Sequence, residues 1–178
     1  IEAMNACAGN AYVNVEKLAE HRNLEALRFR NLLMKEKTIA LPYEDPITFA
    51  VNAARPLIDA MSPDEKDRIE MVITCTESAF DFGKSMSTYV HKLLGLNRNC
   101  RLFELKNACY SGVAGVQMAV NFVLSQASPG ARALVIATDI ARFIQSEDED
   151  APDWSFFEPS AGAGAVAMII SEMPYVFQ

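Results

Sequence analysis

Two side chains in this sequence have the type and the setting of a nucleophile and a base, and the first is Cys109. It follows the strand-like run RLFELK and opens the amphipathic run YSGVAGVQMAVNFVLSQ. Unpaired N–H groups and the helix dipole favour an anion at a helix start, and the thiolate is the nucleophilic form of cysteine. A buried structural cysteine at a strand end fits the same pattern, so the residues alone leave both interpretations open.

The second side chain is Glu77, which ends another predicted strand just past the apolar run Met71–Ile73. A carboxyl group beside desolvated surface is suited to general acid/base work. Glu77 and Cys109, at the ends of two parallel strands, would form a nucleophile and base pair. The structural alternative is that Glu77 caps the helix that follows it or pairs with Lys84.

The elements that must position this pair alternate along the chain. Strands alternating with helices predict an α/β fold, with a mostly parallel sheet and helices on both faces. No helix separates the last two strands, so we expect them to run antiparallel to each other. Chemistry in such sheets collects at the carboxyl ends of the strands, here TCTES, ELKNAC and ATDIAR. The predicted strands are Ile1–Gly9, Ile69–Ser78, RLFELK, Ala131–Ala141 and Ala161–Ser171.

The predicted helices have recognisable ends. Apolar residues at helical spacing predict helical structure within the stretch from Val15 to Lys37, with Asn14 and Asn23 as candidate helix starts. Asp45 is expected to cap a helix that begins at Pro46 and runs to about Met61, after which SPDEKDR reads as a polar turn. MSTYVHKLLGL is expected to stop at Gly95, and Gly112 and Gly115 to let the helix after Cys109 approach its neighbours closely.

Composition bounds the class of protein. The chain has 178 residues, is 51% hydrophobic and has a net charge of −7, which indicates one domain with a real core and argues against nucleic acid as a partner. No apolar run approaches the ~18 residues that span a membrane, and no signal peptide is visible. The chain begins at Ile1 without a methionine and looks trimmed.

The cysteines favour neither a zinc site nor a disulfide framework. No CxxC pair occurs, and His21 and His91 are far from the cysteines in sequence, so we expect no metal site. Cys7 and Cys75 are predicted to be small core residues. A reducing, cytoplasmic setting is the expectation. The four cysteines are Cys7, Cys75, Cys100 and Cys109.

Four segments in order carry a resemblance to a known family: TCTESAFDFGKS, LFELKNACYSG, VIATDIARF and EPSAGAGAVAMIIS. They resemble the 3-hydroxy-3-methylglutaryl (HMG) synthase family of the thiolase fold, with ES-x-x-D and ACY as the specific signatures. MKEKTIALPYEDPITFAVNAARPLIDA and KSMSTYVHKLLGLNRNCRLFELK are similar to the HMG synthase homologues of bacterial polyketide β-branching cassettes. The resemblance implies a thiolase-like layered αβα half with a five-stranded, mostly parallel sheet.

The resemblance also implies a reaction. Cys109 would accept an acetyl group from an acyl carrier protein, and Glu77 would remove a methyl proton. The enolate would then attack the β-ketone of a second carrier-bound thioester. Thioesters of phosphopantetheine or CoA would be the substrates, with no cofactor. The family's catalytic His lies in its second half and has no match here, since His21 and His91 stand in the wrong segments.

Residues 1–178 are therefore expected to be an amino-terminal half, partnered by its own carboxyl-terminal half and by a second copy. Ser160 matches a position near the bound acyl group, or it merely closes a turn. Phe143 stands where many primary-metabolism relatives carry tyrosine, or it is a core aromatic. Arg28 and Arg30, in the basic stretch Arg22–Lys37, could dock an acidic carrier or simply line a solvated helix face.

Two other functions compete with carrier-dependent condensation. One is the HMG-CoA synthase of primary metabolism, which uses acetyl-CoA and acetoacetyl-CoA. The other is a non-catalytic thiolase-fold partner that only shapes a dimer or a carrier surface. The presence of both Cys109 and Glu77 disfavours the non-catalytic interpretation.

Overall fold

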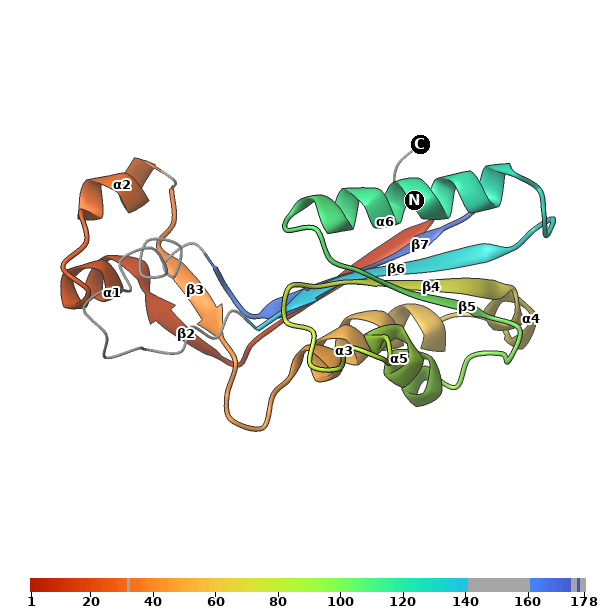
Figure 1. Ribbon diagram of the computed structural model, residues 1–178, viewed down its shortest axis with the longest axis horizontal. Helices are drawn as coiled ribbons and strands as arrows, with labels where there is room; N and C mark the ends of the chain where they lie inside the picture. Colours follow the sequence, from red (N-terminus) through yellow and green to blue (C-terminus); the bar gives the residue numbers. More distant parts are fainter. Residues whose placement is uncertain (32, 141–160, 174–175, 177–178) are drawn as a thin grey trace.

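The computed structural model describes residues 1–31, 33–140, 161–173 and 176. Strands and helices alternate through most of this span, and the chain crosses one sheet repeatedly (Figure 1). The strands are β1 (Ala3–Ala8), β2 (Ala11–Asn14), β3 (Glu36–Ile39), β4 (Ile69–Cys75), β5 (Arg101–Leu105), β6 (Arg132–Asp139) and β7 (Gly164–Ile170). The helices are α1 (Val15–His21), α2 (Ala26–Asn31), α3 (Pro46–Asp59), α4 (Pro63–Asp67), α5 (Met86–Leu94) and α6 (Tyr110–Leu124).

The main sheet has five strands in the described residues, in the order β1-β7-β6-β4-β5. β4 pairs in parallel with both β5 and β6, whereas β7 is antiparallel to β6 and to β1. All strands except β7 therefore point the same way, which confirms the mostly parallel sheet. The predicted antiparallel arrangement of the last two strands is also confirmed.

Helices cover both faces of the sheet, as predicted: α6 lies on one face and α3 and α5 on the other (Figure 1). The central strands are buried on both sides. Val72 and Leu134 pack in the core under α3 and α5, while Ile73 and Val135 pack in the core under α6. This explains why β4 and β6 read as continuous apolar runs rather than alternating ones. Among the described residues, no helix combines the length and apolar character needed to cross a membrane.

The predicted helix ends are confirmed where side-chain chemistry fixes them. The Asp45 carboxylate accepts a hydrogen bond from the Thr48 N–H at 2.6 Å, and Pro46 is the first residue of α3. Gly95 ends α5 in a left-handed conformation with φ of 61°. SPDEKDR was expected to be a turn, but its centre forms the short helix α4, because Ser62 and Glu65 cap its first turn reciprocally.

The two glycines of α6 have different surroundings. A Cβ on Gly115 would lie 2.7 Å from the Cys75 Sγ, so this glycine allows α6 to approach β4 closely. A Cβ on Gly112 would meet nothing within 4 Å, and the prediction of a close approach there is wrong.

Residues 11–39 form an arm that projects from one end of the sheet (Figure 1). The predicted helix start at Asn14 is confirmed, because its side chain caps α1. Asn23, the second predicted start, has a left-handed φ of 54°, and α2 begins three residues later at Ala26. The helical prediction is wrong at its end, where Glu36 and Lys37 belong to β3, which pairs antiparallel with β2.

The arm has its own small core of Val15, Ala19 and Phe29. Thr38 ties it to the main sheet by donating from Oγ1 to the Ala163 carbonyl at 2.6 Å.

Candidate active site

Cys109 lies where the sequence predicts it, at the start of α6, a few residues after β5 ends. Its side chain is exposed, so the alternative of a buried structural cysteine is wrong. The turn before the helix is closed by hydrogen bonds: the Tyr110 N–H donates to the Asn107 carbonyl at 3.1 Å, and the Ser111 Oγ donates to the Ala108 carbonyl at 2.9 Å.

Ala108, the residue before the thiol, has a φ of 45°. An L-residue in the left-handed region costs roughly 1–2 kcal/mol, because Cβ crowds the following carbonyl. Strained backbone of this kind gathers at functional sites, where the surrounding structure holds it. Here the strained turn redirects the chain from the strand into the first turn of α6 and leaves the thiol of Cys109 at the surface.

The other cysteines have settings that oppose ionisation. Cys75 is buried under α6, and burial together with the negative charge of Asp139 raises its thiol pKa to about 11. Burial, with the charge of Glu70 adding to it, raises the pKa of Cys100 to about 11 as well. Burial also raises the pKa of Cys7. The core role predicted for Cys75 is confirmed, whereas Cys7 is only half-buried.

Glu77 lies two residues beyond the end of β4, on a turn that Asp139 holds. The Glu77 N–H donates to the Asp139 Oδ1 at 2.8 Å. The same oxygen accepts hydrogen bonds from the Thr76 Oγ1 at 3.1 Å and from the Ser78 Oγ at 2.9 Å. The Ser78 Oγ in turn accepts from the Ile140 N–H at 3.1 Å. One carboxylate oxygen at the end of β6 thus fixes the turn that carries the candidate base.

The carboxylate of Glu77 is left available for chemistry. It makes no hydrogen bond or ion pair within the described part of the chain, and its side chain is exposed. Ser85, not Glu77, is the N-cap residue of α5, and the Lys84 Nζ lies 3.9 Å from the centre of the Tyr89 ring. Neither structural alternative for Glu77 is therefore supported. The desolvation expected around Glu77 is not supplied by the described residues.

Strand register places Glu77, Asp139 and Cys109 at the same end of the sheet, at or just beyond the carboxyl ends of β4, β6 and β5. Cys75 is level with Leu105 of β5 and with Ala137 of β6 in the parallel ladders. Glu77 and Asp139 each follow this level by two residues, and Cys109 follows it by four. The convergence of TCTES, ELKNAC and ATDIAR at the carboxyl edge of the sheet is thereby confirmed. Asp139 was not assigned a role from the sequence, although its position in ATDIAR was a signal.

The remaining predicted site residues lie elsewhere. Phe143 and Ser160 fall outside the described residues. Arg28 lies in α2 of the arm. Arg30 is exposed on the same helix, and its Nε lies 2.7 Å from the Glu16 Oε1. Among the described residues, no three His, Cys, Asp or Glu side chains come together as a possible metal site.

Comparison with known proteins explains this arrangement. Residues 1–174 match the family described as hydroxymethylglutaryl-coenzyme A synthase N terminal. The chain belongs to the HMG-CoA synthase family. It is 68% identical over 180 residues to the polyketide biosynthesis 3-hydroxy-3-methylglutaryl-ACP synthase PksG of Bacillus subtilis (strain 168). The match covers 100% of this chain and 43% of that protein. It is 36% identical over 166 residues to the hydroxymethylglutaryl-CoA synthase of Enterococcus faecalis, covering 93% of this chain and 40% of the relative.

A solved structure agrees with the family assignment. The HMG synthase of the curacin biosynthetic pathway, in complex with acetyl donor-ACP, superposes with a TM-score of 0.89 at 60% identity, covering 99% of this chain and 42% of that one. The HMG-CoA synthase resemblance and the fold class expected from it are confirmed. The chain spans less than half the length of the relatives it matches, so these residues form one part of the HMG synthase architecture.

Proposed function

We propose that the full-length protein is an HMG synthase that condenses acyl-carrier-protein thioesters in polyketide β-branching. The observation that carries the proposal is the exposed Cys109 at the start of α6, beside a strand end whose turn presents Glu77. The choice of carrier over CoA is supported by the identity of 68% to PksG, against 36% to the Enterococcus faecalis enzyme.

The proposed reaction has three steps. The Cys109 thiolate attacks the acetyl thioester, and the carrier leaves as its thiol, with the backbone N–H of Cys109 stabilising the oxyanion. Glu77 then takes a proton from the acetyl methyl group, and the resulting enolate carbon attacks the β-ketone carbon of a second carrier-bound thioester. Glu77, now protonated, gives that proton to the new alkoxide and is ready for another cycle. Water finally cleaves the bond between the condensed product and the Cys109 Sγ.

Several parts of this protein lie outside the described residues. We assign the catalytic His to a carboxyl-terminal half, which would cover the exposed apolar side chains of α6, among them Val113, Val120 and Leu124. Ser160 and Phe143 are proposed to contact substrate. The enzyme is proposed to work as a homodimer in the cytoplasm, where a reactive thiol stays reduced, on carrier-bound or CoA thioesters and without a further cofactor.

The second candidate is the primary-metabolism enzyme, because the Enterococcus faecalis relative covers 93% of this chain. The two candidates share the roles of Cys109 and Glu77 and differ in the acetyl donor. A non-catalytic partner remains the weakest candidate, since it would have no use for an exposed thiol and a hydrogen-bonded turn presenting a carboxylate.

The test uses the full-length enzyme and compares acetyl transfer from acetyl carrier protein with transfer from acetyl-CoA, at matched concentrations. Transfer from the carrier is expected to be at least about tenfold faster, because specific contacts with the carrier that contribute about 1.4 kcal/mol change a rate or an affinity tenfold. Faster transfer from acetyl-CoA would move the assignment to primary metabolism. No transfer from either donor would favour the non-catalytic alternative.

A further inference from the structure

Ser111 is a buried polar residue in the first turn of α6 that takes no part in the three proposed steps. It is only 5% exposed, and it follows Cys109 by two residues. Its Oγ donates to the Ala108 carbonyl at 2.9 Å, and its N–H donates to the same carbonyl at 3.1 Å. A carbonyl oxygen has two lone pairs, so one residue supplies both donors that hold it.

The Ala108 carbonyl and the Cys109 N–H belong to the same peptide unit. A trans peptide is planar, so these two groups point in opposite directions. Because the carbonyl points into the first turn of α6, toward Ser111, the Cys109 N–H points out of the start of the helix. This N–H donates no hydrogen bond within the described part of the chain. It is the group that the proposed reaction uses to stabilise the oxyanion, so its direction matters for the rate.

The backbone at Ala108 does not favour this direction by itself. Its φ of 45° lies in the left-handed region, which is unfavourable for alanine because Cβ crowds the following carbonyl. Such a conformation persists only where neighbouring contacts hold it. The Tyr110 N–H holds the preceding carbonyl, that of Asn107, at 3.1 Å, and Ser111 holds the carbonyl of Ala108 itself.

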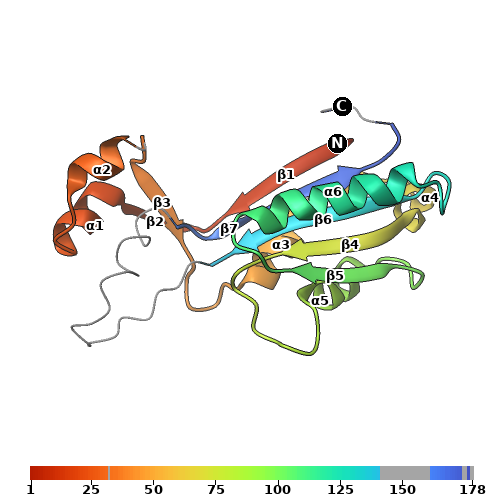
Figure 2. The same cartoon turned by 45° about the horizontal axis from the view of Figure 1, so that its top comes forward.

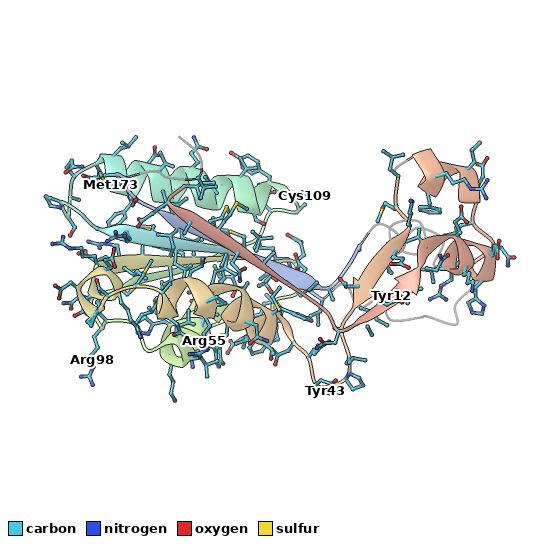
Figure 3. The ribbon with its side chains drawn as sticks, turned by 180° about the vertical axis from the view of Figure 1, so that it is seen from behind. Tyr12, Tyr43, Arg55, Arg98, Cys109 and Met173 are labelled. Atoms are coloured by element: carbon cyan, nitrogen blue, oxygen red, sulfur yellow. The ribbon has the colours of Figure 1, made fainter. Side chains whose placement is uncertain are left out.

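A second serine makes the same kind of bond at the other end of α6. The Ser125 Oγ donates to the Phe122 carbonyl at 2.7 Å, also three residues back in the sequence. Figure 3 shows Cys109 at one end of this helix and Met173 near the other. The bond type is therefore common to both ends, and what distinguishes Ser111 is that its acceptor shares a peptide unit with the N–H of the nucleophile.

We propose that Ser111 is a positioning residue for the oxyanion: its Oγ fixes the peptide between Ala108 and Cys109 so that the Cys109 N–H points at the acyl oxygen. This inference rests on the proposed function, since it needs a thioester carbonyl at the thiol. Attack by the thiolate moves the carbonyl electron pair onto oxygen, and that pair re-forms the C=O bond as the donor thiolate leaves. A donor whose direction is already fixed stabilises this charge without reorganisation.

The test measures single-turnover acetylation of Cys109 in the full-length enzyme, with Ser111→Ala as the variant. Loss of a whole oxyanion donor costs roughly 10²–10³-fold; here the donor stays but is less well directed, so a fall of about tenfold in the saturating rate is expected. The donor concentration that gives half of this rate should not change. Acetyl carrier protein and a small acetyl thioester should show the same factor. Ser111→Thr, which keeps an Oγ, should recover most of the rate.

Alkylation of Cys109 by iodoacetamide separates this role from a structural one. The thiolate displaces iodide at a saturated carbon and no oxyanion forms, so the rate reports only on the thiolate and on access to it. Measured on the peptide that contains Cys109, this rate should be the same in Ser111→Ala and in the parent. Ser125→Ala is the matched control, because it loses the same kind of bond and should leave acetylation and alkylation unchanged.

Three results would overturn the proposal. Acetylation of Ser111→Ala within twofold of the parent would show that the bond does not matter. An equal fall in alkylation would show that Ser111 acts on the thiol and not on the oxyanion, and an equal fall in Ser125→Ala would show a general effect on α6. The proposed function fails separately, if the parent is acetylated by acetyl-CoA and not by the carrier; a tenfold fall with acetyl-CoA in Ser111→Ala would then still support the role of Ser111.

Discussion

The body of the molecule, which is the five-stranded sheet with its covering helices, and the arm, residues 11–39, differ in how their residues are supported. In the body, β4 and β6 are buried on both faces, and one oxygen of Asp139 accepts three hydrogen bonds from the turn that carries Glu77. The arm, which projects from one end of the sheet in Figures 1 and 2, has a core of three buried residues. It exposes the large side chains of Leu27, Leu33 and Tyr12. Precise placement of reacting groups requires the first kind of support, whereas recruitment of a partner requires an accessible, charged surface.

This difference suggests that the body and the arm have separate roles. Changes in the body near the carboxyl edge should alter chemistry with either kind of acetyl donor. Changes in the arm should alter only reactions that need the carrier protein.

The largest effect is expected for Glu77→Gln in the full-length enzyme. A neutral amide of nearly the same size cannot take the methyl proton, and loss of a general base costs roughly 10²–10⁴-fold in rate. Condensation should fall by that factor while acetylation of Cys109 continues. Product formation and acetyl-enzyme are measured in parallel. Condensation near the parent rate would show that Glu77 has a structural role only.

Asp139→Asn should have the next largest effect. The Asp139 oxygen accepts from the Thr76 Oγ1, the Glu77 N–H and the Ser78 Oγ, and hydrogen bonds to a charged acceptor are worth about 1.5–3 kcal/mol. A looser turn should lower the condensation rate about tenfold or more and spare acetylation of Cys109. Equal loss in both steps would contradict a role confined to positioning Glu77.

Gly115→Ala tests the packing of the body without touching the site's polar groups. The new Cβ would lie 2.7 Å from the Cys75 Sγ, and overpacking of this kind costs about 1–3 kcal/mol. Urea unfolding of the full-length enzyme should show this loss of stability. Adding Cys75→Ala should recover part of it, because it removes the atom that clashes. Gly112→Ala, where nothing lies within 4 Å, is the neutral control.

The smallest effect is expected in the arm, for Arg30→Glu. Its ion pair with Glu16 is exposed and screened by solvent, so it contributes little to stability, and reversal of an exposed charge acts mainly on the rate of encounter. Acetylation by the carrier should slow a few-fold at low salt and recover at high salt, with Arg28→Glu behaving alike. Arg98→Glu, at the far end of the sheet in Figure 3, serves as control. Unchanged acetylation at low salt in both arm variants would contradict a carrier-docking role for Arg28 and Arg30.

The sequence predicted the body better than the arm for physical reasons. Buried parallel strands and capped helices leave local signals, such as the run of β4 and the Asp45–Pro46 start of α3. In the arm, Asn23 adopts a left-handed conformation that separates α1 from α2. The short strands β2 and β3 are stabilised by pairing with each other, and they are distant in the sequence, so the local pattern does not reveal them. The role of Asp139 was hidden likewise, because its three partners are about sixty residues away in sequence.

We propose that Cys109 is the one of the four cysteines that takes the acetyl group. The most direct measurement is the intact mass of the full-length enzyme after incubation with acetyl carrier protein, followed by mapping of the modified peptide. We expect the addition of one acetyl group on the peptide containing Cys109, and no addition in Cys109→Ser. Acetylation that survives in Cys109→Ser, or that maps to the buried Cys75, would contradict it.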